Sequence, residues 1–417
     1  MDKKQVISWC LFDFANSSYS AVIAAVIFPV YYAKVIVARG TGAGDLWWGA
    51  AISVSMLAVS LSSPFLGGVA DYAGLRKRFL AIYTLACVFS VASFSLLQPG
   101  MALTGFLLII IANMGMEGGL VFYNSFLPRI APPEYQGRVS GWGFGIGYAG
   151  SILSLVLAYI IFLTADIRII WPATAAFFLL FSIPSFLFLP ADAPQYISPA
   201  GAGKEGMRKA WQTLKDIWKQ KEARKFLAAY LIYEDGVNTV IVFSSLLAST
   251  TFGFSDKERI ILYIAVQAAA LAGAFILSKP TDVWGPKRVV MISLVLWSIV
   301  SIAAFISRTK THFWIVACTA GLGLGSVQAG TRAFFTQFVP EGKEAEYFGV
   351  YSLIGKSSAV IGPLVFGSAS ASLGQRYAIL FISAFFMAGL GILALVKGGG
   401  PNIREKVSRI SAKAGII

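Results

Sequence analysis

Residues 67–78 read GGVADYAGLRKR, and residues 278–288 read SKPTDVWGPKR. Both segments follow a long apolar run, and both place an aspartate, then a glycine, then a basic pair at matching positions. A second matching pair, EYQG at 134–137 and EYFG at 346–349, is separated by nearly the same distance, about half of the 417-residue chain. Matches at one nearly constant spacing indicate that the chain consists of two related halves.

Apolar runs of membrane-spanning length fill both halves. Hydrophobic residues make up 57% of the chain and charged residues only 13%, whereas about a quarter of the residues in a soluble domain are charged. Runs of roughly 20 apolar residues match the thickness of a bilayer, and in lipid such runs must be helices. We therefore predict an all-α membrane protein with about twelve spans, at 6–36, 46–70, 77–97, 101–126, 138–163, 169–189, 226–248, 258–278, 288–307, 312–336, 346–372 and 376–396.

One long interruption, 190–225, divides these spans six and six. An even number of spans in each half means that the halves run parallel, related by an axis along the membrane normal. The predicted domains are an N-terminal six-helix bundle at 1–190, a cytoplasmic linker at 191–225, a C-terminal six-helix bundle at 226–397 and a basic cytoplasmic tail at 398–417.

Lysine and arginine are distributed unevenly between the loops. With both termini inside, the inner loops carry about three times as many of them as the outer loops, which predicts cytoplasmic termini. The net charge of +14 then faces an anionic leaflet, so we expect membrane lipids rather than nucleic acid as its partner. Within the linker, Trp211, Leu214 and Trp218 share one helical face among lysines, which suits a helix lying on that leaflet. We expect a monomer.

Charged side chains inside the predicted spans are the first candidates for function, because each costs at least about 2.5 kcal/mol to insert. Five of the six charged residues lie in spans 1, 4, 7 and 10, and Lys356 lies in span 11. Polar residues recur beside them at helical spacing, as expected for helix faces that line a water-filled path between the helices. The candidate substrate- and proton-binding residues are Asp13, Asn16, Asn113, Glu117, Asn124, Tyr230, Glu234, Asp235, Asn238, Gln328 and Arg332.

These charges have two interpretations. Asp13, Glu117 and Glu234 could bind a proton, another cation or a small-molecule substrate, and the planar fork of Arg332 suits a substrate carboxylate or phosphate. Alternatively, they form structural ion pairs, for example Glu117 with Arg332, that hold the halves together. Asp235 could point at a neighbouring helix, and Lys356 is expected to be a pair partner or to extend toward the membrane surface.

The duplicated loop segments predict a conformational latch. In each, an aspartate at a helix end can cap a helix start and bind across to the next helix, which would hold one conformation. The residues of the predicted latch are Asp71, Gly74, Arg76, Lys77, Asp282, Gly285, Lys287 and Arg288. In the fifth span, Gly141, Gly143 and Gly145 predict close approach of another helix.

The sequence lacks the residue patterns that metal binding, disulfide formation, ATP binding and catalysis would need. Cys10, Cys87 and Cys318 lie inside apolar runs, and the single histidine is His312, so we expect no metal site and no disulfide framework. No phosphate-binding glycine loop of the P-loop type is present, so ATP is not expected to drive the protein. We expect no cofactor and no enzymatic activity, because one peripheral histidine offers no nucleophile–base set.

The segment GGVADYAGLRKR resembles the loop 2–3 signature of the major facilitator superfamily, except that Leu75 stands where a basic residue is usual. SWCLFDFANSSYS at 8–20, YEDGVNT at 233–239 and GKSSAVIGPLVFG at 355–367 resemble the vacuolar amino-acid effluxer branch linked to autophagy, which has many bacterial members. By that resemblance, Asp13 and Asn16 match the family's Asp-x-x-Asn motif, and Asp235 with Gly236 matches its seventh helix. The resemblance implies a twelve-helix transporter in a bacterial plasma (inner) membrane.

The sequence thus predicts a secondary active transporter that works by alternating access. A zwitterion such as an amino acid would satisfy both signs of buried charge, and the carboxylates favour proton coupling. The alternatives are efflux of amphiphilic drugs or lipids, and a membrane sensor that does not transport.

Overall fold

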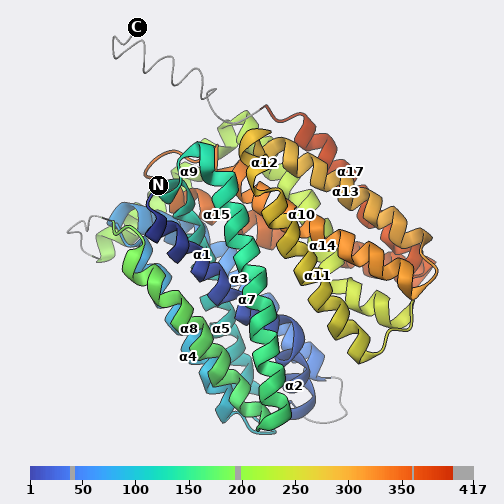
Figure 1. Ribbon diagram of the computed structural model, residues 1–417. Helices are drawn as coiled ribbons and strands as arrows, with labels where there is room; N and C mark the ends of the chain where they lie inside the picture. The colour runs from blue at the N-terminus through green and yellow to red at the C-terminus, as the bar shows by residue number, and fades with distance from the viewer. Residues whose placement is uncertain (38–42, 193–198, 359–360, 398–417) are drawn as a thin grey trace, which may run out of the picture.

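The computed structural model describes residues 1–37, 43–192, 199–358 and 361–397. Every regular element in this part of the chain is helical (Figure 1). The predicted all-α class is therefore confirmed. The predicted basic tail at 398–417 lies outside the described residues.

The first half forms one bundle around an apolar core that extends from Val6 to Leu189 and also includes Ala345 of the second half. Helix α1 begins after Asp2, whose side chain accepts a hydrogen bond from the backbone N–H of Lys4 at 2.8 Å. The elements of this half are α1 (Lys3–Ser18), η1 (Tyr19–Val26), α2 (Phe28–Tyr31), η2 (Tyr32–Ile36), α3 (Ala43–Ala73), α4 (Arg76–Ser93), η3 (Phe94–Leu96), α5 (Ala102–Ser125), α6 (Leu127–Ile130), η4 (Pro133–Tyr135), α7 (Gln136–Thr164), η5 (Ile167–Ile169) and α8 (Ile170–Phe188).

The second half has a separate core, from Ile217 to Val396. Helix α9 (Pro199–Lys219), the helix of the predicted linker, comes before the other helices of this half and contributes Ile217 to the core. The elements of the second half are α10 (Lys221–Thr250), α11 (Asp256–Ile276), α12 (Ser278–Val283), α13 (Pro286–Ile306), α14 (Lys310–Thr336), α15 (Glu344–Ser357), α16 (Ile361–Leu373) and α17 (Gln375–Ala394).

Nine helices within the described ranges are long and apolar enough to cross a membrane. The stretch Lys3–Val26 with Phe28–Ile36, bent by 42° just before Pro29, makes a tenth. Proline cannot donate the backbone hydrogen bond that a continuous helix needs, which accounts for a bend here. Helix α10 and the α15–α16 pair pack among these spans, and with them the arrangement is consistent with the predicted twelve.

The two halves meet through α3 against α15 and through α7 against α11, α12 and α14. Glycines make this approach possible: a methyl group added at Gly141 would lie 2.7 Å from the carbonyl oxygen of Ala274, and one at Gly349 would lie 2.8 Å from Cα of Pro64. Small residues let helices in a membrane pack backbone to backbone. Figure 1 shows the halves together near the end that holds the N-terminus and diverging toward the opposite end.

Candidate functional site

A buried ion pair joins the two halves. Asp13 lies on α1 in the first half, and Arg332 lies on α14 in the second. Oδ2 of Asp13 accepts hydrogen bonds from Nη1 and Nη2 of Arg332, both at 3.4 Å. The two side chains are 8% and 3% exposed. Because an isolated buried charge is costly, each of these residues depends on the other half for its partner.

Arg332 is enclosed by groups of the first half. Its Nε donates to Oγ of Ser140 at 2.9 Å, its Nη2 donates to the carbonyl oxygen of Ser140 at 2.9 Å, and its Nη1 donates to Oδ1 of Asn124 at 3.1 Å. The rings of Trp9 and Phe144 lie 4.5 Å and 4.1 Å from the guanidinium carbon. A carboxylate ligand could therefore reach this guanidinium only by replacing Asp13 or Asn124.

Helix α7 reaches the pair because residue 143 is glycine. A methyl group there would lie 2.6 Å from Oδ2 of Asp13 and 2.9 Å from Nη2 of Arg332, far inside normal contact. On the other side of Asp13, Nδ2 of Asn16 donates to Oδ1 at 3.4 Å. Asp13, Asn16, Asn124 and Arg332, all predicted from the sequence, are thus brought together.

A second ion pair also crosses between the halves. Lys356 on α15 donates to the carboxylate of Glu117 on α5, and both side chains are mostly buried. Glu117 therefore pairs with Lys356, whereas Arg332 pairs with Asp13. The structural alternative raised from the sequence had named the partner of Glu117 as Arg332, and that partner is wrong.

Glu234 on α10 makes no hydrogen bond or ion pair with any other residue in the described part of the chain. It lies on the same helix as Tyr230, whose ring stacks on Tyr351 at a centroid distance of 4.5 Å. Lys356 and both phenols are close enough to interact with its carboxylate electrostatically. Glu234 is thus a half-buried carboxylate beside the second ion pair, with a lysine nearby and no direct partner.

Asn113, Asn238 and Gln328 make no hydrogen bond or ion pair with Asp13 or Arg332 in the described part of the chain, although Gln328 lies one helical turn before Arg332 on α14. Asn113 is held in the first half, where its Nδ2 donates to Oγ of Ser55 at 2.7 Å. Asn238 donates to Oγ of Ser358 at 3.2 Å within the second half, and Asp235 is buried with partners of its own. Gln328 does link the halves, because it accepts a hydrogen bond from the hydroxyl of Tyr148 at 2.7 Å.

Four residues at this site were not predicted: Trp9, Ser140, Phe144 and Tyr148. A signal for three of them was present, since Ser140, Phe144 and Tyr148 recur every four residues along the glycine-rich fifth span. Trp9 likewise precedes Asp13 by one helical turn. Aromatic and serine residues in a span usually pack without functional consequence, so this spacing alone does not mark these side chains as part of a site.

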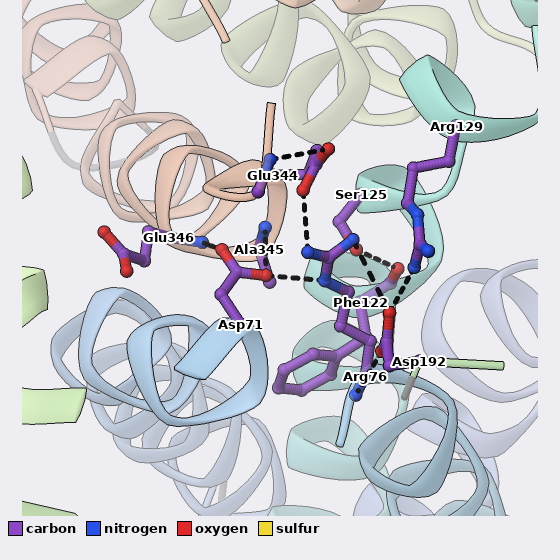
Figure 2. Close-up of polar contacts among 10 residues, drawn as sticks. Asp71, Arg76, Phe122, Ser125, Arg129, Asp192, Glu344, Ala345 and Glu346 are labelled. Atoms are coloured by element: carbon purple, nitrogen blue, oxygen red, sulfur yellow. Dashed lines mark hydrogen bonds and ion pairs between the residues drawn. The ribbon is translucent and has the colours of Figure 1, made fainter. Parts of the chain in front are cut away.

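The predicted latch residue Asp71 binds the first turn of a helix from the other half (Figure 2). Its carboxylate accepts hydrogen bonds from the backbone N–H groups of Ala345 and Glu346, at 3.1 Å and 2.9 Å, where α15 begins. Arg76 then joins the two halves, since it binds Asp71 at 2.6 Å and Glu344 at 2.7 Å. A carboxylate at a helix start satisfies unpaired N–H groups and the positive end of the helix dipole.

Two further residues extend this cluster in the first half. Figure 2 shows Asp192 between Arg76 and Arg129. Asp192 accepts a hydrogen bond from the backbone N–H of Arg76 at 3.3 Å and forms an ion pair with Arg129. The corresponding cluster in the second half is simpler.

In the second half, Asp282 makes the equivalent contact with a helix of the first half. Its carboxylate accepts hydrogen bonds from the backbone N–H of Arg138, at 3.1 Å and 3.2 Å, in the first turn of α7. The Arg138 side chain lies 3.5 Å away. Each half therefore caps a helix of the other, at the same end of the molecule. We call this pair of contacts, Asp71 with α15 and Asp282 with α7, the latch.

The other predicted latch residues act within one half. Nζ of Lys77 donates to the carbonyl oxygens of Leu187 and Leu189, at 3.3 Å and 2.7 Å, at the end of α8. Lys287 does the same at the end of α17, with Ala394 and Val396. Gly74 and Gly285 have φ of 65° and 88°, the left-handed region that glycine tolerates. Arg288 is exposed.

No three His, Cys, Asp or Glu side chains gather as a metal site within the described ranges. Two parallel helical halves, joined by buried charges and by a duplicated loop contact, are the architecture of the major facilitator fold. Solved structures share this fold. The human organic anion transporter MFSD10 (TETRAN) has a TM-score of 0.75 at 12% identity, covering 94% of this chain and 100% of that one. FucP has a TM-score of 0.71 at 13% identity, covering 94% and 98%.

The chain belongs to the family described as "Vacuole effluxer Atg22 like", whose model matches residues 49–399. It is 30% identical over 413 residues to the uncharacterized MFS-type transporter YxiO of Bacillus subtilis (strain 168), covering 94% of this chain and 95% of the relative. It is 22% identical to autophagy-related protein 22-1 of Penicillium rubens, covering 82% and 74%. The predicted family is confirmed, and the protein is a multi-pass membrane transporter rather than an enzyme.

Proposed function

We propose that this protein is a secondary transporter that moves a small zwitterion or anion, such as an amino acid, by proton-coupled alternating access. The observation that carries the proposal is the Asp13–Arg332 ion pair, which is buried and shared between the two halves. A contact that must break when the halves rock apart links the charge state of the site to the conformation of the protein.

The surroundings of Arg332 favour a substrate with a carboxylate. The planar guanidinium suits bidentate binding of such a group. Two of its partners, Asp13 and Asn124, lie at 3.4 Å and 3.1 Å, which is longer than a strong charge-assisted bond, whereas its bonds to Ser140 are 2.9 Å long. A substrate carboxylate would take their place, and the released Asp13 would then be available for an ammonium group. A zwitterion would thus leave both charges paired.

Glu234 is the best candidate for the coupling proton. Glu117 is bound by Lys356, so its protonation would break an ion pair. Glu234 has Lys356 as an electrostatic neighbour only and no direct partner among the described residues. A carboxylate in that position can gain or lose a proton at little structural cost, as a proton carrier requires.

The latch supports alternating access. With Asp71 and Asp282 both capping a helix of the opposite half, the protein is held in a conformation closed at this end. Opening would require both caps to be lost together, which favours two discrete states over gradual movement. We place the latch end in the cytoplasm of a bacterial cell, because the excess of lysine and arginine lies in the loops at that end.

The experiment is flux in proteoliposomes that contain the purified protein. Counterflow of a panel of labelled amino acids identifies a substrate, and uptake driven by a pH gradient measures coupling. We expect Glu234→Gln to abolish gradient-driven accumulation while counterflow continues, and Arg332→Ala to abolish both. Glu341→Gln, an exposed carboxylate near the start of α15, is the matched control and should leave both rates unchanged.

Two outcomes would contradict the proposal. Retention of wild-type counterflow in Arg332→Ala would exclude Arg332 from substrate binding. Retention of gradient-driven accumulation in Glu234→Gln would exclude Glu234 as the proton carrier, and counterflow without any pH-driven uptake in the wild type would exclude proton coupling.

A further inference from the structure

Helix α9 has one face against the protein, and that face is connected to the latch. Ala210, Thr213 and Ile217 are buried along it. The Thr213 hydroxyl donates a hydrogen bond to the carboxylate of Glu346. The backbone N–H of the same Glu346 donates to Asp71 at 2.9 Å. One residue at the start of α15 is therefore held from one side by the latch and from the other by α9.

Close packing reinforces this connection. A methyl group added at Gly206 on α9 would lie 2.7 Å from Cα of Val69 on α3. Three residues further along α3, the ring of Tyr72 receives the ammonium group of Lys209 at 4.1 Å from its centroid. Helix α9 is thus fixed to the last turns of α3, immediately beside Asp71, and it cannot move without disturbing the latch.

The opposite face of α9 is exposed and carries large apolar side chains. Met207, Trp211 and Trp218 are 54%, 58% and 70% exposed. Basic groups lie over the indoles, with Lys215 at 5.6 Å from Trp211 and Arg224 at 5.7 Å from Trp218. Such a face is unfavourable in water, but tryptophan with lysine or arginine is the combination found where protein meets the headgroup region of a bilayer.

The charge on this face is positive. The acidic residues in the described part of α9 are already paired, Glu205 with Arg208 and Asp216 with Lys343. Lys204, Lys215 and Lys219 are exposed and have no acidic partner among the described residues. Three unpaired cations beside three apolar side chains complement an anionic lipid surface in both charge and polarity.

We propose that the outer face of α9 docks on the headgroups of anionic phospholipids, and that this contact stabilises the latched conformation. The bilayer holds α9 in place, α9 holds Glu346, and Glu346 keeps its N–H on Asp71. The transporter would therefore favour the state closed at the latch end in an anionic leaflet and open that end more readily in a neutral one. The inference does not depend on which solute is transported.

The test is hydrogen–deuterium exchange on the full-length protein in lipid nanodiscs. One set of nanodiscs contains phosphatidylcholine alone, and the other contains phosphatidylcholine mixed with phosphatidylglycerol. The readout is the exchange rate of the amides of Ala345 and Glu346, which donate to Asp71. Because each basic residue at an anionic surface changes binding by about fivefold, we expect exchange at least about fivefold slower with phosphatidylglycerol.

The triple variant Lys204→Gln, Lys215→Gln, Lys219→Gln should lose this dependence on lipid charge. A matched control removes three exposed basic residues elsewhere, as Lys3→Gln, Arg78→Gln, Lys279→Gln, and should keep it. Replacing both exposed tryptophans by alanine should weaken the dependence without changing the charge. High salt should also reduce it, because salt screens charges at a surface.

Equal exchange in the two lipids for the wild type would overturn the proposal, and would indicate that the exposed face serves a protein partner instead. Loss of the lipid dependence in the control variant as well would also overturn it, because the effect would then come from net charge rather than from α9.

Discussion

The substitution Gly143→Ala offers a direct test of the central ion pair, because it adds one methyl group at a known position. That methyl group would lie 2.6 Å from Oδ2 of Asp13, 2.7 Å from Cζ3 of Trp9 and 2.9 Å from Nη2 of Arg332. Ordinary contact begins at 3.4 Å, so the Asp13 carboxylate must move by roughly 0.8 Å. Its bonds to Arg332 are already 3.4 Å long, and they would not survive such a shift.

The size of the effect follows from the cost of overpacking. Adding a methyl group to a tightly packed site costs about 1–3 kcal/mol. When Arg332 withdraws, the Asp13 carboxylate can turn away from the methyl group, whereas the contact with Trp9 lies within the first half and remains. The part of the cost that is relieved favours the state open at the latch end, whose population should rise by roughly 5-fold for each 1 kcal/mol.

A buried cysteine between the halves reports that population. Thr281 on α12 is 2% exposed and faces Gly137 of α7. In a Thr281→Cys protein with Cys318 replaced by alanine, the rate of maleimide labelling measures how often this end opens. The two other native cysteines are buried. We expect Gly143→Ala to raise the labelling rate by the factor given above.

Gly119→Ala on α5 is the control. It introduces the same alanine into a helix of the same half, with the same gain in helix propensity of about 1 kcal/mol. A methyl group there meets only Cβ of Tyr83, at 3.6 Å. Equal labelling rates in Gly143→Ala, Gly119→Ala and the parent would refute the reasoning.

Three further predictions concern the contacts around this site. Asp71→Ala and Asp282→Ala should each expose the first-turn amides of the helix that they cap, at a cost of about 1–2 kcal/mol, measured by hydrogen exchange. Glu117→Gln should lower thermal stability by leaving Lys356 buried and unpaired, and the exchange of Glu117→Lys with Lys356→Glu should recover part of the loss. Lys77→Met should destabilise the first half by about 1–3 kcal/mol in thermal unfolding, because two carbonyl oxygens lose their donor.

Each of these predictions has a contradicting result. Protection unchanged at α15 in Asp71→Ala would mean that the cap does not hold the halves together. If the double variant Glu117→Lys, Lys356→Glu is no more stable than Glu117→Gln alone, Lys356 has another partner. For Lys77→Met, the control is Arg78→Met at the adjacent exposed position, and equal destabilisation by both would argue against the carbonyl contacts.

The sequence predicted the features that repeat or that are costly to bury. The duplicated segments around Asp71 and Asp282 predicted two related halves and a contact at one end, because an aspartate and a glycine at fixed spacing have few other uses at a helix end. The helices followed from the length of the apolar runs. Asp13 and Arg332 were identified because a charge in a membrane span needs a functional or structural reason.

What the sequence could not provide was which charges pair. Glu117 and Asp13 both lie inside a span, and spacing along one helix says nothing about distance to another. Only the packing of α5 against α15 brings Glu117 to Lys356. Lys77 and Lys287 were grouped with the latch because they adjoin it in sequence, whereas a long side chain can turn back to its own half.

The most direct test of the account is the distance between the halves at the latch end when the central ion pair is removed. Spin labels at the exposed positions 78 and 288, on α4 and α13, report that distance in the full-length protein by pulsed electron paramagnetic resonance. We predict one predominant short distance in the parent and a second, longer population in Asp13→Asn. A distance distribution in Asp13→Asn that is identical to that of the parent would contradict the claim that this ion pair helps to hold the two halves together.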